Sequence, residues 1–186
     1  MPEQSNALPQ QPQQQLAEFA QQLLACQNAA AAKAFITPML DLFCQLGDIQ
    51  LHPEFFTDTD ATLTAYGKAV SMTTAAQCAE DSERSRVFMQ GIYQAITDQL
   101  ALKPNKTVRV LYAGTGPFGW LLLPLLPLLT AAQLQLWLLD IHPQSLACLR
   151  QLIRYFSLDD RVAEIICADA SNWQPEPAVQ FDLIVS

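Results

Sequence analysis

The sequence is short of glycine and of basic residues. Only 6 of its 186 residues are glycine, and 10 lysine or arginine residues stand against 18 aspartate or glutamate residues, for a formal net charge of −8. Nucleic-acid binding draws its affinity from clustered lysine and arginine side chains. The charge balance therefore argues against a nucleic-acid partner and favours a small-molecule or protein partner.

The sequence also lacks paired cysteines. Its five cysteines are odd in number and widely separated, and none belongs to a Cys-x-x-Cys motif. That spacing fits neither a disulfide framework nor a zinc site, so we expect no bound metal. We predict reduced thiols that act as small hydrophobic side chains in the core of a cytoplasmic protein. They are Cys26, Cys44, Cys78, Cys148 and Cys167.

Targeting and membrane-spanning segments are missing as well. Residues 1–15 are rich in glutamine and proline and have neither the basic nor the apolar region of a signal peptide, so we expect a disordered tail. The leucine-rich run 120–129 is shorter than the roughly 20 residues that span a bilayer. Because Pro124 and Pro127 interrupt it, we predict a buried, kinked helix on a sheet and no membrane partner.

The first part of the chain, residues 16–103, reads as a helical region. Alanine, glutamine and leucine favour a helix over 16–33 and a second one up to residue 46, with a break near Pro38 and an end at Gly47. Residues 49–66 have the composition of a loop. Ser71 is a suitable N-cap for one long helix that runs to about Leu102.

Residues 104–186 alternate between strand and helix patterns. Such alternation predicts an α/β fold of the Rossmann-like type, a doubly wound parallel sheet with right-handed crossovers. The expected strands are 107–113, 134–139, 162–167 and 181–185, and the expected helices are 117–130 and 143–156.

Three of the six glycines fall within residues 114–119, directly after the first expected strand. They read G-x-G-x-x-G, in which Gly114 permits a tight turn, Gly116 lets a ligand approach the backbone and Gly119 lets helix pack on strand. The helix expected next would add unpaired N–H groups and a partial positive charge. Because the motif lies between a strand and an apolar segment, it predicts a nucleotide-like cofactor.

Acidic residues end the next two expected strands. Asp140 lies 21 residues after Gly119, where an acid accepts hydrogen bonds from ribose hydroxyls in nucleotide-binding folds. An N-cap for the helix that starts near Pro143 is the alternative role. Asp169 is placed to accept a hydrogen bond from an exocyclic amine, with an ordinary Asx turn as its alternative.

Together these segments resemble the successive motifs of class I S-adenosylmethionine-dependent methyltransferases over about half of the chain. The resemblance implies that S-adenosyl-L-methionine binds with its methionine part over the glycine turn, its ribose at Asp140 and its adenine beside Asp169. The acid that often stands two positions before the first glycine is Tyr112 here. The resemblance also implies the strand order 3-2-1-4 for the parallel sheet. The implied cofactor-binding residues are Ala113, Gly114, Thr115, Gly116, Gly119, Asp140, Ile141, Asp169 and Ala170.

The segment Asp81-Ser82-Glu83-Arg84 resembles the one that precedes the cofactor motif in protein arginine methyltransferases. The resemblance implies that Arg84 binds the cofactor's carboxylate, with Arg86 as a second choice, because a guanidinium binds carboxylate in bidentate fashion. A solvated helix face with i,i+4 pairs is the alternative. No catalytic residue is assigned, although His52, His142, Trp173 and Tyr112 are pocket candidates.

Two other functions remain open. A NAD- or FAD-dependent oxidoreductase shares the glycine turn and the acid, although such folds usually open with that strand rather than after about a hundred helical residues. In the family, acceptor-binding residues follow the fourth strand, so we expect 104–186 to be the N-terminal portion of a longer methyltransferase domain. The last strand would otherwise leave an exposed edge that pairs with a second copy in a homo-oligomer. An inactive, truncated binding domain is the third reading.

Overall fold

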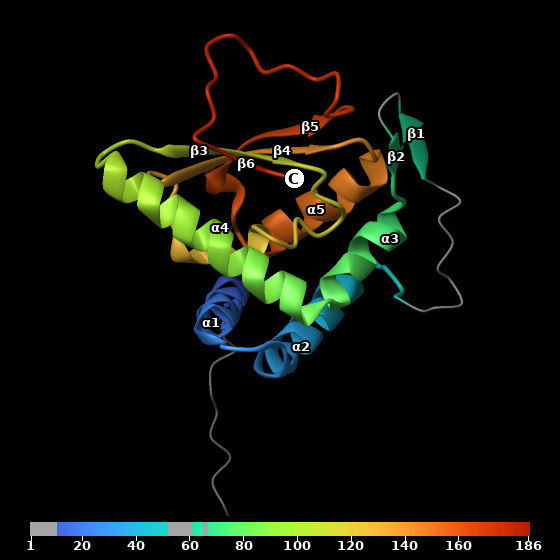
Figure 1. Ribbon diagram of the computed structural model, residues 1–186. Coiled ribbons are helices and arrows are strands. Elements are labelled where there is room, and N and C mark those ends of the chain that lie inside the picture. Colours follow the sequence, from blue (N-terminus) through green and yellow to red (C-terminus); the bar gives the residue numbers. More distant parts are fainter. Residues whose placement is uncertain (1–10, 52–60, 65–66) are drawn as a thin grey trace, which may run out of the picture.

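The computed structural model describes residues 11–51, 61–64 and 67–186, and Figure 1 shows their arrangement. The helices are α1 (Pro12–Ala25), α2 (Ala29–Gly47), α3 (Met72–Gln77), η3 (Cys78–Glu80), α4 (Ser82–Leu102), η4 (Leu123–Leu128), α5 (Pro143–Tyr155) and η5 (Asp159–Arg161). The strands are β1 (Thr62–Thr64), β2 (Gly67–Ala69), β3 (Val108–Ala113), β4 (Leu134–Asp140), β5 (Val162–Cys167) and β6 (Leu183–Val185).

Four parallel strands form the main sheet, in the order β5-β4-β3-β6. The prediction of an α/β fold with a parallel sheet is therefore confirmed. Strand β6 is anchored by Asp182, whose carboxylate accepts hydrogen bonds from the Arg109 backbone N–H at 2.9 Å and from Lys103. Parallel alignment brings the carboxyl ends of β3, β4 and β5 to one edge of the sheet.

The two faces of this sheet are covered differently. Helices α1, α2, α4 and α5 lie on one side, and the irregular connection 168–182 passes over the other (Figure 1). Val110, Leu136 and Leu138 belong to the large helical core, whereas their neighbours on the opposite face do not. There Trp137 contacts Phe181, with ring centroids 5.3 Å apart. The connection from β5 to β6 thus covers its face with a few aromatic side chains rather than with a helix.

The N-terminal helices begin and break earlier than predicted. Helix α1 already starts at Pro12, inside the segment expected to be disordered. The break lies at residues 26–28, where the Asn28 side chain accepts a hydrogen bond from the N–H of Ala31 at 2.9 Å. Pro38, the expected break, lies inside α2. The N-cap therefore determines the boundary, and α2 continues through Pro38 although a proline there removes one backbone hydrogen bond and crowds the preceding turn.

The single long helix expected from Ser71 to Leu102 is divided. Ser71 does cap α3, but that helix ends at Gln77 and a 3-10 turn follows. Asp81 then caps α4 by accepting a hydrogen bond from the N–H of Arg84 at 2.9 Å. A second side-chain cap within the run is what separates the two helices.

The prediction of a helix over residues 117–130 is also wrong. Turns follow the glycine cluster, and only the short 3-10 helix η4 forms in this stretch. Pro124 and Pro127 lack the N–H groups that an α-helix would use, so the backbone adopts tighter i→i+3 turns. The glycine turn consequently has no α-helix N-terminus behind it, and the partial positive charge expected there is not available.

A two-stranded antiparallel hairpin, β1 and β2, forms within and just after the segment read as a loop. Each strand is three residues long, too short for a period-2 pattern to be recognised. The hairpin continues through Val70 and Ser71 into α3, which places both elements beside the carboxyl edge of the main sheet (Figure 1).

Helix α2 is, within the described ranges, the one helix long and apolar enough to cross a membrane. Core helices of globular proteins share that length and composition. Ile36, Leu40 and Phe43 of α2 are buried in the helical core, where Phe43 contacts Phe118, Trp120 and Phe156.

Candidate functional site

The glycine turn joins β3 to the following 3-10 segment at the carboxyl edge of the sheet. The N–H of Gly114 donates to the carbonyl of Leu139 at 2.8 Å, which extends the β3–β4 ladder by one residue. Gly114, Gly116 and Gly119 have φ angles of +75°, +58° and +54°. L-residues rarely adopt this left-handed conformation, so the turn needs glycine at all three positions.

The three glycines have different surroundings. A Cβ at Gly114 would meet nothing within 4 Å, so this backbone is open to a ligand. A Cβ at Gly116 would lie 3.2 Å from the Cβ of Ala75, because α3 covers that residue. At Gly119 it would lie 2.9 Å from Leu149 of α5. The open approach expected at Gly116 is therefore found at Gly114, and Gly119 packs against a helix rather than a strand.

Asp140 ends β4 and is 5% exposed. Its Oδ2 accepts a hydrogen bond from the N–H of Gly116, and its Oδ1 accepts one from the N–H of His142, both at 2.8 Å. The carboxylate therefore holds the glycine turn and the residue before α5 in place. It is not the N-cap considered above, because the N-cap of α5 is His142, which makes no capping hydrogen bond with its side chain. Each carboxylate oxygen has a second lone pair, so Asp140 keeps the capacity to accept ligand hydroxyls.

A cavity of about 450 Å³ opens at this edge of the sheet. Its volume lies in the range of small-molecule sites, about 300–1,000 Å³. Six predicted residues line it: Gly114, Gly116, Asp140, Ile141, Asp169 and Ala170. Four predicted residues do not line it: Ala113, Thr115, Gly119 and Arg84.

One wall of the cavity comes from the hairpin and α3, which the sequence did not connect with the site. This wall contains Thr64, Gly67, Lys68, Ala69, Val70 and Ala75. His142 joins it to α5, because its Nε2 donates to the carbonyl of Val70 at 2.9 Å. His142, a pocket candidate from the sequence, lines the cavity too, and the other lining residues that the site prediction missed are Leu139, Ser145, Ala168 and Ser171.

Asp169 lies at the end of β5, partly exposed, and forms an Asx turn with its own loop. Its Oδ1 accepts hydrogen bonds from the Ser171 hydroxyl at 2.6 Å and from the Ser171 N–H at 2.9 Å. The bond from the Ser171 hydroxyl is the main reason that the pKa of this carboxyl is lowered. Asp169 therefore combines the turn role with a place in the cavity wall.

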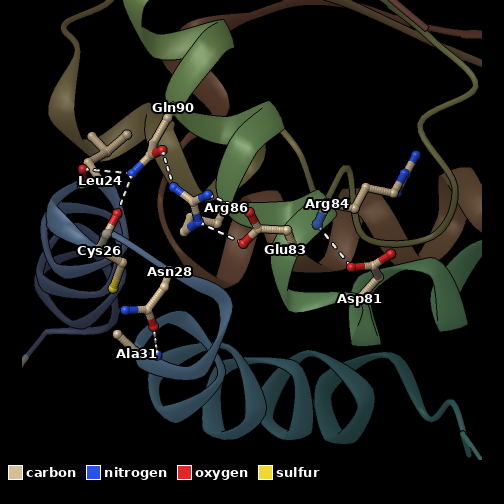
Figure 2. Close-up of polar contacts among 9 residues, drawn as sticks. All are labelled: Leu24, Cys26, Asn28, Ala31, Asp81, Glu83, Arg84, Arg86 and Gln90. Carbon is tan, nitrogen blue, oxygen red and sulfur yellow. Dashed lines mark hydrogen bonds and ion pairs between the residues drawn. The ribbon is translucent and has the colours of Figure 1, made fainter.

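The two arginines near the start of α4 behave differently (Figure 2). Arg86 pairs with Glu83 at 2.6 Å and donates to Gln90, which in turn donates to the carbonyls of Leu24 and Cys26. This network ties α4 to the end of α1. Arg86, the alternative to Arg84 in the sequence prediction, therefore has a structural role. The Arg84 side chain points away from it, and its guanidinium carbon lies 5.4 Å from the Phe88 ring centroid.

Arg84 has no ion-pair partner among the residues that the structure describes. Tyr112, two positions before the first glycine of the turn, is buried, and desolvation raises its pKa to about 12. Near neutral pH it is therefore an uncharged phenol and supplies no carboxylate to the glycine turn.

The thiols do not form a reactive group. All five are free, and burial raises the pKa of Cys44 and Cys148 to about 11, so both stay protonated near neutral pH. Cys78 and Cys167 are exposed, contrary to the expectation of core cysteines. No group of three histidine, cysteine, aspartate or glutamate side chains gathers within the described ranges. His52 lies outside these ranges.

Comparison with known proteins found no match: no protein-family model, curated protein or solved structure is significantly similar to this chain.

Proposed function

We propose that this chain is the cofactor-binding portion of an S-adenosylmethionine-dependent methyltransferase whose acceptor is a small metabolite or a protein side chain. The observation that carries the proposal is the meeting of three features in one cavity. The open backbone of Gly114, the buried carboxylate of Asp140 and the partly exposed carboxylate of Asp169 come from the ends of three neighbouring strands.

The sheet topology supports the same function. Counted from the strand before the glycine turn, the order β5-β4-β3-β6 reads 3-2-1-4, the order that the resemblance implies. In open parallel sheets, ligands bind beyond the carboxyl ends of the strands near the point where the order reverses. That point is the β3 end, where Gly114 lies.

Each residue has a role that suits its surroundings. Asp140 accepts hydrogen bonds from the ribose, since both of its oxygens retain a lone pair. Asp169 lies one strand further along, beside the adenine, and Gly114 leaves space for the methionine part. Arg84, which has no ion pair among described residues, is available for the cofactor's carboxylate but lies outside the cavity wall.

The chemistry asks little of the protein beyond positioning. The cofactor supplies a methyl group on a sulfonium, which is transferred in line to a nucleophilic acceptor. The chain's own residues therefore need to orient the donor and exclude water rather than form a covalent intermediate. This agrees with a cavity lined by backbone, two carboxylates, hydroxyl groups, Lys68, His142 and apolar residues, in which none of the lining residues described is a cysteine.

Isothermal titration of the protein with S-adenosylhomocysteine tests the proposal, with NAD⁺ and NADH as comparison ligands. We expect saturable binding of one S-adenosylhomocysteine per chain and none of either dinucleotide. Binding of NAD(H) without S-adenosylhomocysteine would favour the oxidoreductase instead. Cofactor binding without methyl transfer to any acceptor tested would favour the inactive binding domain.

A further inference from the structure

Ser145 is a buried serine whose hydroxyl has no hydrogen-bond partner. Its side chain is fully buried, and its Oγ is the one buried side-chain nitrogen or oxygen, among the residues described, that lacks a partner. Leaving a buried polar group unpaired costs the desolvation of that group without any compensating hydrogen bond, and such groups are uncommon in folded proteins. An alanine would occupy the same place in the helix without that cost and with a higher helix propensity.

The position of Ser145 connects this hydroxyl with the cavity. It is the third residue of α5 and lines the same cavity as Asp140, whose carboxylate contacts the residue just before the helix. The first turn of α5 also has backbone N–H groups without acceptors in the part of the chain that the structure describes. His142, the N-cap residue, directs its imidazole to Val70, and Pro143 has no N–H. The N–H groups of Gln144 and Ser145 have no acceptor among the described residues.

We propose that the Ser145 hydroxyl is a ligand-binding group that donates a hydrogen bond to a ribose hydroxyl of the bound cofactor. This inference rests on the proposed function. It adds a donor to a place where Asp140 supplies only acceptors. A ribose hydroxyl both donates and accepts, so it satisfies Asp140 and Ser145 together once the serine rotates about χ1 toward the cavity.

The same pairing defines which ligands the site selects. A nucleoside with free 2′ and 3′ hydroxyls meets an acceptor at Asp140 and a donor at Ser145. A 2′-phosphate would bring negative charge against the buried carboxylate of Asp140, which is 5% exposed. A deoxyribose that lacks the contacted hydroxyl would leave the Ser145 hydroxyl without an acceptor. We therefore expect preference for unmodified ribose.

Two serine variants test this inference. Ser145→Ala is expected to leave the melting temperature unchanged or slightly raised and to weaken S-adenosylhomocysteine binding about 5- to 10-fold, the value of one net hydrogen bond. The matched control is Ser85→Ala, because Ser85 is equally buried but its hydroxyl accepts a hydrogen bond from Trp120 Nε1 at 2.8 Å. That variant should lose stability and keep its affinity.

The ribose contact is isolated by titrating both the wild-type protein and Ser145→Ala with the 2′-deoxy and 3′-deoxy forms of S-adenosylhomocysteine. For the analogue that lacks the contacted hydroxyl, the two proteins should bind equally. Equal losses for all three ligands, or a melting temperature that falls as for Ser85→Ala, would overturn the inference. If wild type binds S-adenosylhomocysteine and Ser145→Ala binds it equally, only this inference fails. If wild type does not bind it, the proposed function fails as well.

Discussion

Asp140 and Asp169 are the same kind of residue near the carboxyl ends of neighbouring strands, yet their environments differ. Asp140 is buried and accepts hydrogen bonds from the backbone of Gly116 and His142, two segments that would otherwise be independent. Asp169 is partly exposed and accepts its hydrogen bonds within its own loop, from Ser171 and Asn172. The first carboxylate organises the site, whereas the second organises only its own turn.

This difference shows that two aspartates in one cavity wall can differ greatly in how much of the surrounding structure depends on them. Replacing Asp140 disturbs the backbone on both sides of the cavity before any ligand is considered. Replacing Asp169 disturbs a turn that water can solvate. Stability and affinity should therefore be coupled at Asp140 and largely separate at Asp169.

The largest effect is expected from Asp140→Ala. It leaves the N–H groups of Gly116 and His142 without an acceptor, which should lower the free energy of unfolding by about 2–4 kcal/mol. Affinity for S-adenosylhomocysteine should fall with it. Chemical denaturation and calorimetric titration measure the two losses.

Asp140→Asn sharpens that test, because the amide keeps one acceptor oxygen but turns an N–H donor toward the other backbone N–H. It should be less stable than wild type and bind weakly. Asp98→Ala, at an exposed position on α4, serves as a charge control with little change in either quantity. Unchanged stability in Asp140→Ala would contradict the organising role assigned to this carboxylate.

The next effect concerns the two glycines at the cavity. Gly116→Ala combines left-handed backbone with a contact of 3.2 Å to Ala75, so it should cost about 1–3 kcal/mol of stability. Gly114→Ala has similar strain but no neighbour within 4 Å, so its stability loss should be smaller. Its added methyl group enters the space assigned to the ligand, and its affinity loss should be the larger one. Thermal melts and titrations of both variants would expose a reversed order.

The smallest effect is expected at Asp169. Asp169→Asn should reduce the affinity for S-adenosylhomocysteine less than about tenfold, because a solvated hydrogen bond contributes little net free energy. The lowered pKa of this carboxyl has a defined pH signature. Its stabilising contribution is present above the unfolded value, near 3.8, and is lost as the pH falls through the lower folded value. Acid titration of the variant should therefore show a shallower stability loss than wild type below pH 4.

A control for this pH effect is Asp182, far from the cavity. Its pKa is also lowered, first by the backbone N–H of Arg109 and then by Lys103. Asp182→Asn should flatten the acid loss of stability without changing ligand affinity near neutral pH. If Asp169→Asn changes neither affinity nor acid stability, the role of Asp169 in both the turn and the site is refuted.

The strands of the α/β region were predictable because each is a mostly apolar run between recognisable breakers, with single polar residues such as Arg109, Gln135 and Glu164 inside the three longer ones. The predicted bounds of the third strand, 162–167, are those of β5, and the second differs only by including Asp140. Three glycines next to such a strand also indicated the turn. These signals are local, so a single sequence carries them.

The errors arose where several local signals compete. Trp120 to Leu129 is apolar enough for a helix, but its prolines remove the necessary N–H groups. Asp81 interrupts a run of helix-forming residues by capping a new helix. Pro38, by contrast, is tolerated inside α2. Which signal prevails depends on packing and hydrogen bonds that no short window of sequence contains.

Part of the cavity was not predictable, for a different reason. Its second wall comes from the hairpin and α3, about 40 residues before the glycine turn in the chain, and only tertiary folding brings Ala75 against Gly116. Lys68 and Val70, which belong to this wall, are not part of any recognisable sequence motif. Ser145 likewise looks like an ordinary helix residue until its hydroxyl is found buried and unpartnered.

The contact between Ala75 and Gly116 has a consequence for how the chain can be divided. The boundary near residue 104 separates helical from alternating sequence, but the cavity has walls on both sides of it. A protein cut there would retain the glycine turn and lose its cover, and the apolar surface beneath α1 and α2 would be bared to water. The helical region is thus an integral part of the cavity, and the chain cannot be cut near residue 104 without removing one of its walls.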